Sequence, residues 1–247
     1  MVAGWKPARN PLISIPPICM NLLFRTDPGA FMSADRRDFI RRFGMGVVMA
    51  AVPSALAGEW ALTPTQTEGP FYPDRLPLDT DNDLLRVNDA EKEAAGEVTY
   101  LSGRIINPAG EPLRDARVEI WQCDATGVYL HSGSGGDKAR RDAGFQGFGR
   151  CLTGATGEYV FRTIKPVSYP GRAPHIHVAV KLPGQPKWTS QCYIKGHPQN
   201  EGDFLWKGTG DQAARDLLTV DFAPLAGAKA GALAAVFNIV LGVTPAE

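Results

Sequence analysis

The feature that most constrains the fold of this chain is a series of short apolar or alternating segments after residue 97. They lie at residues 100–106, 116–123, 159–163, 175–182, 189–194 and 236–241. Turn sequences such as NPAG at 107–110 and DATG at 124–127 separate them. Short segments of this kind, without long stretches of 3.6-residue period between them, are typical of strands. The sequence therefore predicts an all-β fold, an antiparallel β-sandwich with long loops, over residues 98–247.

Residues 58–97 have a different character. Pro64, Pro70, Pro73 and Pro77 exclude long regular elements, because proline fixes φ and has no N–H to donate. We expect an irregular, Pro-rich N-terminal arm that wraps the sandwich. Short helices are predicted only at 211–218, where Asp211 can cap the first turn, and at the Ala-rich residues 226–235.

The first 57 residues carry an export pattern. Arg36 and Arg37 lie in a segment, 35–41, that resembles the twin-arginine motif, and an apolar run follows at 43–56. This run ends at ALA (55–57), the small-x-small pattern of a signal-peptidase site. It is too short and too interrupted to predict a membrane span. We expect a twin-arginine signal peptide at 32–57 and a periplasmic or secreted protein with no stable membrane span after cleavage; a buried helix or an uncleaved anchor is the alternative.

Residues 1–31 match neither a signal peptide nor a globular segment. Met32 stands where a signal peptide would begin. We expect either that the chain starts at Met32 or that residues 1–31 form a disordered extension.

Charge and cysteine content narrow the class of protein further. The chain has 26 Lys and Arg against 26 Asp and Glu, so no basic excess points to nucleic acid. After residue 57 it contains Cys123, Cys151 and Cys192, an odd number that cannot pair completely. None shows CxxC spacing, so we expect buried apolar thiols.

His175 and His177 are the best candidate metal ligands from the residues alone. In a strand they point to the same face, so one ion could bind both. Imidazole suits zinc, copper, iron or nickel, and the pair could equally line a core or hold a structural zinc. Phenolate oxygens from Tyr129 and Tyr169 would instead favour a hard ion such as Fe(III).

Several longer motifs occur in one order along the chain: TQTEGPFYP at 65–73, VEIWQ at 118–122, GVY at 127–129, FQGFGRCLT at 145–153, GEYVFRTIKPVSYP at 157–170, APHIH at 173–177 and FNIVLG at 237–242. In this order they resemble the intradiol ring-cleavage dioxygenases, most closely the β-chain type of protocatechuate 3,4-dioxygenase. The resemblance covers most of the chain after residue 57.

The resemblance implies one non-haem Fe(III) per chain, held by four ligands: Tyr129, Tyr169, His175 and His177. It gives Tyr169 a displaceable role, and it places Arg172 and Gln191 beside the substrate ring, so these three are the expected catalytic residues. The implied reaction uses O₂ to cleave a catechol-type ring between its two hydroxylated carbons, giving a muconate-type diacid. Whether the protein is a homo-oligomer is left open.

One departure from the family and two alternatives accompany this interpretation. Only Pro170 and Gly171 separate Tyr169 from Arg172, fewer residues than in the better-known protocatechuate enzymes, so we expect a different, more open pocket wall. Residues 102–121 alone would also suit a secreted, transthyretin-like β-sandwich binding module without catalysis. A zinc or copper protein that uses only the histidine pair is the second alternative, and metal analysis distinguishes all three.

Overall fold

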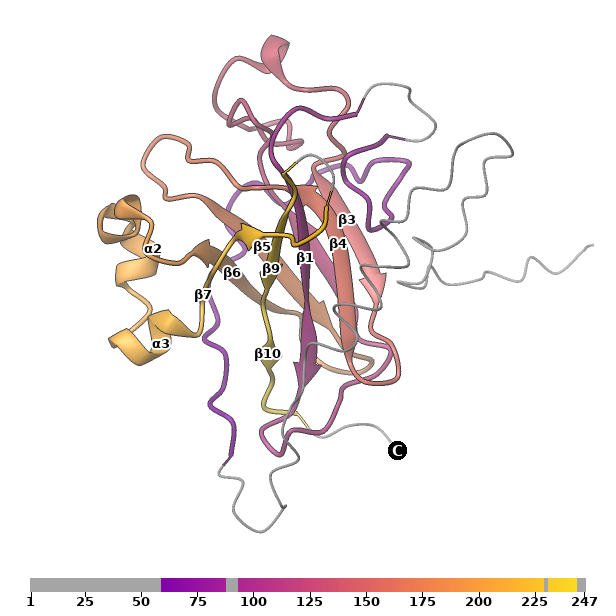
Figure 1. Cartoon of the computed structure of the whole chain (residues 1–247), viewed down its shortest axis with the longest axis vertical. Helices are drawn as coiled ribbons and strands as arrows, with labels where there is room; N and C mark the ends of the chain where they lie inside the picture. The colour runs from indigo at the N-terminus through magenta and orange to yellow at the C-terminus, as the bar shows by residue number, and fades with distance from the viewer. Residues whose placement is uncertain (1–58, 88–92, 229–230, 244–247) are drawn as a thin grey trace, which may run out of the picture.

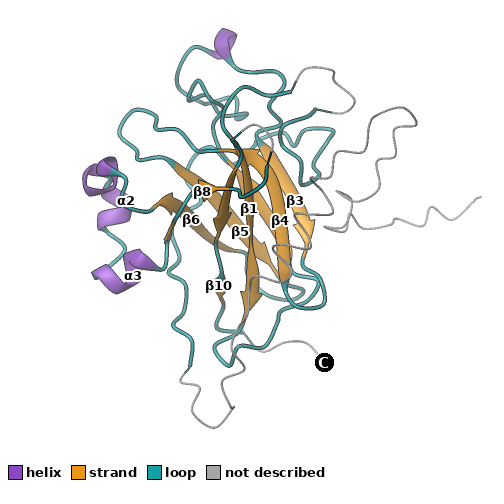
Figure 2. Ribbon diagram, viewed as in Figure 1, coloured by secondary structure: helices purple, strands orange, loops and turns teal. Residues whose placement is uncertain are grey.

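The computed structural model describes residues 59–87, 93–228 and 231–243. Within them the chain is rich in strands and loops and has few helical turns (Figure 2). The strands are β1 (Val98–Ile106), β2 (Arg117–Trp121), β3 (Phe148–Leu152), β4 (Glu158–Ile164), β5 (His175–Lys181), β6 (Trp188–Ile194), β7 (Thr219–Val220), β8 (Ala223–Pro224), β9 (Leu233–Val236) and β10 (Ile239–Val240). The helical segments are η2 (Lys138–Arg140), η3 (Pro198–Gly202), α2 (Phe204–Lys207) and α3 (Gln212–Asp216).

The strands form two five-stranded sheets that lie in two layers (Figure 1). In one sheet β1 pairs with β4 on one side and with β9 and β10 on the other, and β8 extends β9. The second sheet has the order β3-β2-β5-β6-β7. Both sheets are mixed, because β1 is parallel to β9 and β10, and β6 is parallel to β7. The prediction of purely antiparallel sheets is therefore wrong at these pairs.

The parallel pair β6–β7 depends on a long connection that the sequence pattern did not reveal. A parallel neighbour requires a crossover of a dozen or more residues. Between β6 and β7 this crossover contains η3, α2 and α3, which lie together at one side of the sheets (Figure 1).

Alternate residues of β5 face two different clusters. Ile176 and Val178 belong to the main core, to which the strands β1 and β4 of the other sheet also contribute. Ala179 belongs instead to a second cluster on the other face of β5. Because side chains alternate along a strand, His175 and His177 lie on the same face as Ala179. The strand is therefore buried on both faces, and its histidines lie outside the apolar core.

The described part of the N-terminal arm, residues 59–87, runs across both sheets without forming a long element. The Thr63 N–H donates to the Val240 carbonyl (3.1 Å), and the Gln66 N–H donates to the Thr189 carbonyl (3.0 Å). Further along, Leu84 is fully buried in the main core. The arm therefore extends past β6, and this course brings it over the face that carries the histidines.

The predicted helix at residues 226–235 is wrong. Strand β9 takes up the end of this stretch and pairs with β1, with Ala235 opposite Leu101. Its Leu233 and Ala235 are buried, whereas Ala234 and Val236 are more exposed, which is the two-residue period of a strand. Alanine favours helices, but this preference is weak and the pairing with β1 overrides it.

The predicted strand at 236–241 is interrupted between β9 and β10. The Phe237 N–H donates to the Ser102 carbonyl (2.8 Å), and the Phe237 carbonyl accepts from the Tyr159 hydroxyl (2.5 Å). Gly103 allows this approach, because a Cβ there would lie 2.0 Å from the Phe237 oxygen. The close contact at Gly103 thus divides the predicted strand in two.

Other predictions about local structure had mixed outcomes. The helix expected at 211–218 is α3, with the Asp211 carboxylate accepting the Ala214 N–H (2.9 Å). Neither β3 nor α2 was predicted; β3 has few of the β-branched residues that mark strands, and α2 is only four residues long.

The cysteines differ in part from the expectation. Cys123 and Cys192 are free and buried, as expected. Cys151 is disulfide-bonded, so its expected free thiol is wrong. The expectation was based only on the cysteines after residue 57.

The predicted extension 1–31 and signal peptide 32–57 also lie outside the described residues. Among the residues that are described, no helix has the length and apolar character needed to cross a membrane.

Candidate metal centre and substrate site

His175 and His177 lie at the start of β5 with their rings side by side. Their Nε2 atoms are 3.1 Å apart, and each residue is 1% exposed. Trp121 of β2 lies opposite His177 in the sheet and stacks on it, with ring centroids 4.8 Å apart and planes 9° apart. The stacked indole leaves the His177 ring little room to rotate.

The hydrogen bonds of the histidines identify the nitrogen atoms that are available as ligands. His175 Nδ1 lies 2.7 Å from the Ala173 carbonyl, which can only accept, so Nδ1 carries the proton and Nε2 has a free lone pair. Burial, and then the Arg172 charge, lowers the pKa of His175 to about 3. Burial and His175 hold the pKa of His177 well below its usual value. Both rings are therefore neutral, the form that binds metals.

Tyr129 comes from the loop after β2. Asp124 caps the turn before it by accepting backbone N–H groups, and the Tyr129 N–H donates to Ser134 Oγ (2.9 Å). The Tyr129 hydroxyl lies 3.4 Å from His175 Nε2, and the residue is only 2% exposed. Burial, reinforced by the neighbouring Tyr169, raises the pKa of Tyr129 well above its usual value. A cation bound beside this phenol would favour its ionised form.

Tyr169 and Arg172 are joined by a tight turn. The Arg172 N–H donates to the Tyr169 carbonyl (3.0 Å), with Pro170 second and Gly171, at φ +81°, third in the turn. This is the type II pattern, in which glycine readily supplies the positive φ. The turn returns Arg172 Nη1 to within 3.3 Å of the Tyr169 hydroxyl. Burial raises the pKa of Tyr169, and the Arg172 charge opposes that rise.

Arg172 also reaches two side chains of β6. Its Nη2 donates to Gln191 Oε1 (2.5 Å) and to the Tyr193 hydroxyl (3.2 Å). Gln191 and Tyr193 are the sheet partners of the two histidines, so they share the same face. The Tyr193 hydroxyl donates in turn to Gln66 Oε1 (3.1 Å) on the arm. All six residues predicted for the site thus lie within one connected group.

The arm covers this group from outside. Phe71 stacks on Tyr129, with ring centroids 4.9 Å apart, and meets the edge of Tyr169 at 6.0 Å. Gly69, at φ +73°, passes so close to the site that a Cβ there would lie 3.4 Å from His177 Cε1. These contacts explain why the motif at 65–73 lies far from the ligands in sequence but next to them in space.

Five contributors to the site were not predicted from the sequence: Gln66, Phe71, Trp121, Tyr193 and Asp203. Gln66 and Phe71 belong to the 65–73 motif, which was a usable signal. Asp203 precedes a short apolar stretch, the position of a helix N-cap, and its carboxylate accepts from Arg172 Nε (2.9 Å). Burial pushes the pKa of Asp203 up, but hydrogen bonds from the Trp206 and Ala173 amides and from Arg172 outweigh it, so the pKa is lowered.

A pocket of about 520 Å³ opens beside Tyr169 and Arg172. Its lining comes from the Tyr169–Arg172 turn and from η3 and its flank: Ser168, Tyr169, Pro170, Gly171, Arg172, Ala173, Pro198, Gln199, Gly202 and Asp203. Among these residues Arg172 is the one cation, and its guanidinium is already hydrogen-bonded to four side chains. The pocket is large enough for a small aromatic ring.

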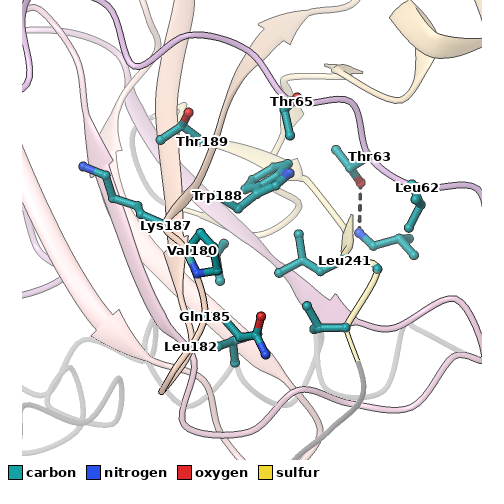
Figure 3. Close-up of a pocket in the computed structure, with 14 residues that line it drawn as sticks. Leu62, Thr63, Thr65, Val180, Leu182, Gln185, Lys187, Trp188, Thr189 and Leu241 are labelled. Atoms are coloured by element: carbon teal, nitrogen blue, oxygen red, sulfur yellow. Dashed lines mark hydrogen bonds between the residues drawn. The ribbon is translucent and has the colours of Figure 1, made fainter.

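Another pocket, of about 470 Å³, lies away from these residues. Figure 3 shows it between Leu62 to Thr65 of the arm, Trp188 and Thr189 of β6, and Leu241. None of the predicted ligands lines it, so it takes no part in the site.

The donor set fits a hard metal ion. Four donor atoms converge from Tyr129, Tyr169, His175 and His177, and the Tyr129 hydroxyl is hydrogen-bonded to Tyr169. His177 Nδ1 has no hydrogen-bond partner within the described residues, whereas its Nε2 faces His175 Nε2 at 3.1 Å. The described residues contain no group of three or more His, Cys, Asp or Glu that could hold a metal. Two imidazoles and two phenols suit Fe(III) better than zinc.

Comparisons with known proteins identify the family to which the chain belongs. A family model described as dioxygenase matches residues 67–243. The chain is 36% identical over 178 residues to the protocatechuate 3,4-dioxygenase beta chain of Burkholderia cepacia, covering 68% of this chain and 75% of the relative. It is 31% identical over 191 residues to a catechol 1,2-dioxygenase of Acinetobacter baylyi, covering 70% of this chain but only 57% of that enzyme.

The chain is also similar to a solved structure of a dioxygenase domain. The dioxygenase domain of a dioxygenase and carbohydrate-binding protein fusion from Streptomyces sp. SirexAA-E aligns with a TM-score of 0.57 and 31% identity, covering 74% of this chain and all of that domain. The matched region contains all four candidate ligands together with Arg172 and Gln191. The chain therefore belongs to the intradiol ring-cleavage dioxygenase family, whose members are oxidoreductases.

Proposed function

We propose that this chain is an exported non-haem Fe(III) dioxygenase that uses O₂ to cleave catechol-type rings between their hydroxylated carbons, giving muconate-type diacids. One Fe(III) per chain is held by four ligands: Tyr129, Tyr169, His175 and His177. The names of related proteins describe protocatechuate, catechol and hydroxyquinol dioxygenases. A binding module without catalysis is not favoured, because the family model spans the site as well as the sheets.

One observation carries this proposal: two neutral imidazoles and two phenols meet beside a single arginine. The Nε2 atoms of His175 and His177 are 3.1 Å apart, and the Tyr129 hydroxyl is 3.4 Å from His175 Nε2. A core cluster of this composition would leave several polar atoms competing for few partners. Coordination of a cation satisfies them together.

The residues around the proposed iron have separate tasks. When bound, Fe(III) supplies a Lewis acid that draws electron density from a catecholate and makes its ring reactive toward O₂. Tyr169 is half-buried and borders the pocket, so its oxygen is placed to accept a proton from a substrate hydroxyl. Arg172 is a permanent cation that can stabilise negative charge developing on the ring. Gln191 fixes one edge of that guanidinium.

Metal analysis and visible spectroscopy of the purified protein test the function. We expect about one iron per chain and a tyrosinate-to-Fe(III) charge-transfer band that shifts when catechol is added. Ring cleavage should consume O₂ and produce a diacid. Zinc in active protein, or an active protein without this band, would contradict the proposal.

The pocket predicts a substrate without a required carboxylate. The lining offers no cation except Arg172, and Lys138, Arg140 and Arg141 lie outside it. We expect kcat/KM for catechol or a substituted catechol to be at least as high as for protocatechuate, because no free cation is available to bind a ring carboxylate. Steady-state kinetics on both substrates check this.

A strict requirement for the carboxylate would refute this substrate prediction. Lys138, Arg140 and Arg141 would then be the first candidates for a carboxylate-binding group, because they lie on the loop that follows Tyr129. Replacing each by alanine would identify the one whose loss raises KM for protocatechuate but not for catechol.

Export is the part of the proposal that depends on the sequence alone. The pair Arg36-Arg37 and the apolar run after it support transport of the folded, metal-loaded protein. We expect mass spectrometry of the exported form to find a new N-terminus near Gly58, and Arg36→Lys with Arg37→Lys to prevent export. An active, uncleaved protein that is unaffected by this double change would refute export.

A further inference from the structure

We propose that Asp203 is a positioning residue for the ring-cleavage reaction, which it serves by fixing the direction of the Arg172 guanidinium. This inference rests on the proposed function and goes beyond it, because Asp203 borders the pocket but is hydrogen-bonded to none of the four candidate ligands. Its carboxylate accepts from Arg172 Nε at 2.9 Å. The Asp203 side chain is 0% exposed and that of Arg172 is 9% exposed, so the pair is shielded from water.

Asp203 is the carboxylate partner of the Arg172 guanidinium. The other hydrogen bonds of the guanidinium go to oxygens that are not carboxylates, those of Tyr169, Gln191 and Tyr193. The guanidinium also lies over the Phe204 ring, 5.5 Å from its centroid. A long arginine side chain adopts many rotamers unless a fixed partner restricts it. By binding Nε, the Asp203 carboxylate leaves Nη1 and Nη2 to point at Tyr169 and Gln191, on the side of the site.

Asp203 is itself held by hydrogen bonds from the backbone. Its Oδ1 accepts from the backbone N–H groups of Leu205 (2.9 Å) and Trp206 (3.0 Å), which makes it the N-cap of α2. Its Oδ2 accepts from the Ala173 N–H (2.9 Å) as well as from Arg172. Three backbone donors therefore hold the carboxylate in place before the guanidinium binds it, which is the arrangement required for preorganisation.

Ala173 connects Asp203 to the candidate ligand His175. The Ala173 N–H donates to Asp203, and the Ala173 carbonyl accepts from His175 Nδ1 (2.7 Å). Asp203 thus anchors both the arginine and the backbone that sets the direction of a candidate ligand. Partners of this kind, one contact away from a metal ligand, tune a site without touching the metal.

The substitution Asp203→Asn separates positioning from helix capping. Asparagine caps helices about as well as aspartate, so its oxygen can keep the bonds to Leu205 and Trp206. Its NH₂ group would then face Arg172 Nε and the Ala173 N–H, which are both donors, and cannot replace the lost contacts. The matched control is Asp211→Asn, the same change at the N-cap of α3, where the carboxylate accepts from Ala214 and contacts no site residue.

The experiment compares Asp203→Asn, Asp211→Asn, Arg172→Leu and the double variant Asp203→Asn/Arg172→Leu as iron-loaded proteins. For Asp203→Asn we expect iron content and the visible band within roughly twofold of the wild type, while kcat falls roughly 10- to 100-fold, the range for partners that act through another group. Asp211→Asn should keep the full kcat. The double variant should be no slower than Arg172→Leu, because Asp203 acts through Arg172.

A second readout does not depend on iron. In urea unfolding of the metal-free proteins, each single change should lower the midpoint, and the double change should lower it by less than the sum of the two. If Asp203 were only a helix cap, the urea midpoint of the double variant would fall by the sum of the two single shifts, and its kcat would fall by the product of the two single losses. That result would overturn the inference. So would an Asp203→Asn variant with an unchanged kcat.

Two further outcomes remain decisive. If Asp203→Asn does not fold, Asp203→Glu takes its place, because glutamate keeps the charge but shifts the carboxylate by one methylene. We expect this variant to bind iron but to lose at least roughly tenfold in kcat, since positioning is sensitive to such displacements. Full activity of Asp203→Glu would overturn the inference. A wild-type protein without ring-cleaving activity would overturn the proposed function together with the inference, whereas active wild type with equally active Asp203 variants overturns the inference alone.

Discussion

Replacing His177 by alanine is expected to abolish iron binding and, with it, ring cleavage. His177 is a buried, neutral imidazole whose Nε2 faces that of His175, and its ring is held by stacking on Trp121. Loss of a partner behind a metal ligand already weakens binding by roughly 10- to 100-fold, so loss of a ligand itself should cost more than this. Iron content per chain and the visible band measure the effect, and His175→Ala and Tyr129→Phe should behave alike.

Two comparisons make this prediction specific. His197→Ala removes a histidine that accepts from the Gln199 N–H and lies outside the donor set, so it should keep iron and rate. Tyr169→Phe should keep iron and lose rate, because a displaceable ligand matters mainly when substrate binds. If His177→Ala retained a full complement of iron, the ligand set proposed here would be wrong.

The sequence predicted that the two histidines share one face of a strand, because this depends only on their separation of two residues. A strand alternates its side chains, so residues 175 and 177 had to share a face, and the structure places their Nε2 atoms 3.1 Å apart. The type II turn that joins Tyr169 to Arg172 is also a local matter, set by Pro170 and Gly171. Features of this kind need only the period of an element or the φ preference of a residue.

Contacts between distant parts of the chain left no comparable signal. Gln66 and Tyr193 are 127 residues apart, and Arg172 and Asp203 are 31 apart. Each of these residues is an unexceptional polar side chain until the fold brings its partner near. For the same reason the Ala-rich residues 226–235 suggested a helix, because β1, the strand with which β9 pairs, is distant in the sequence.

Replacing Arg172 by leucine is expected to lower kcat by roughly 100- to 1,000-fold while iron and the visible band remain, the range seen when one preorganised charge-stabilising group is removed. The reason is that Arg172 contacts Tyr169 and Gln191 but is not among the proposed ligands, so we expect it to act on the reacting ring rather than on the metal. Steady-state kinetics with catechol, together with iron analysis of the same samples, measure the two effects separately.

The same variant also tests the charge balance of the site. Breaking a fully buried ion pair costs about 3–5 kcal/mol of unfolding free energy. In Arg172→Leu three backbone amides still donate to Asp203, so we expect a smaller decrease in the free energy of unfolding than this. Arg215→Leu is the matched control, because Arg215 packs on Trp206 and donates to backbone carbonyls away from the ligands, so it should keep the full kcat. An Arg172→Leu variant that turned over every catechol at the wild-type rate would show that the charge of Arg172 plays no part in ring cleavage.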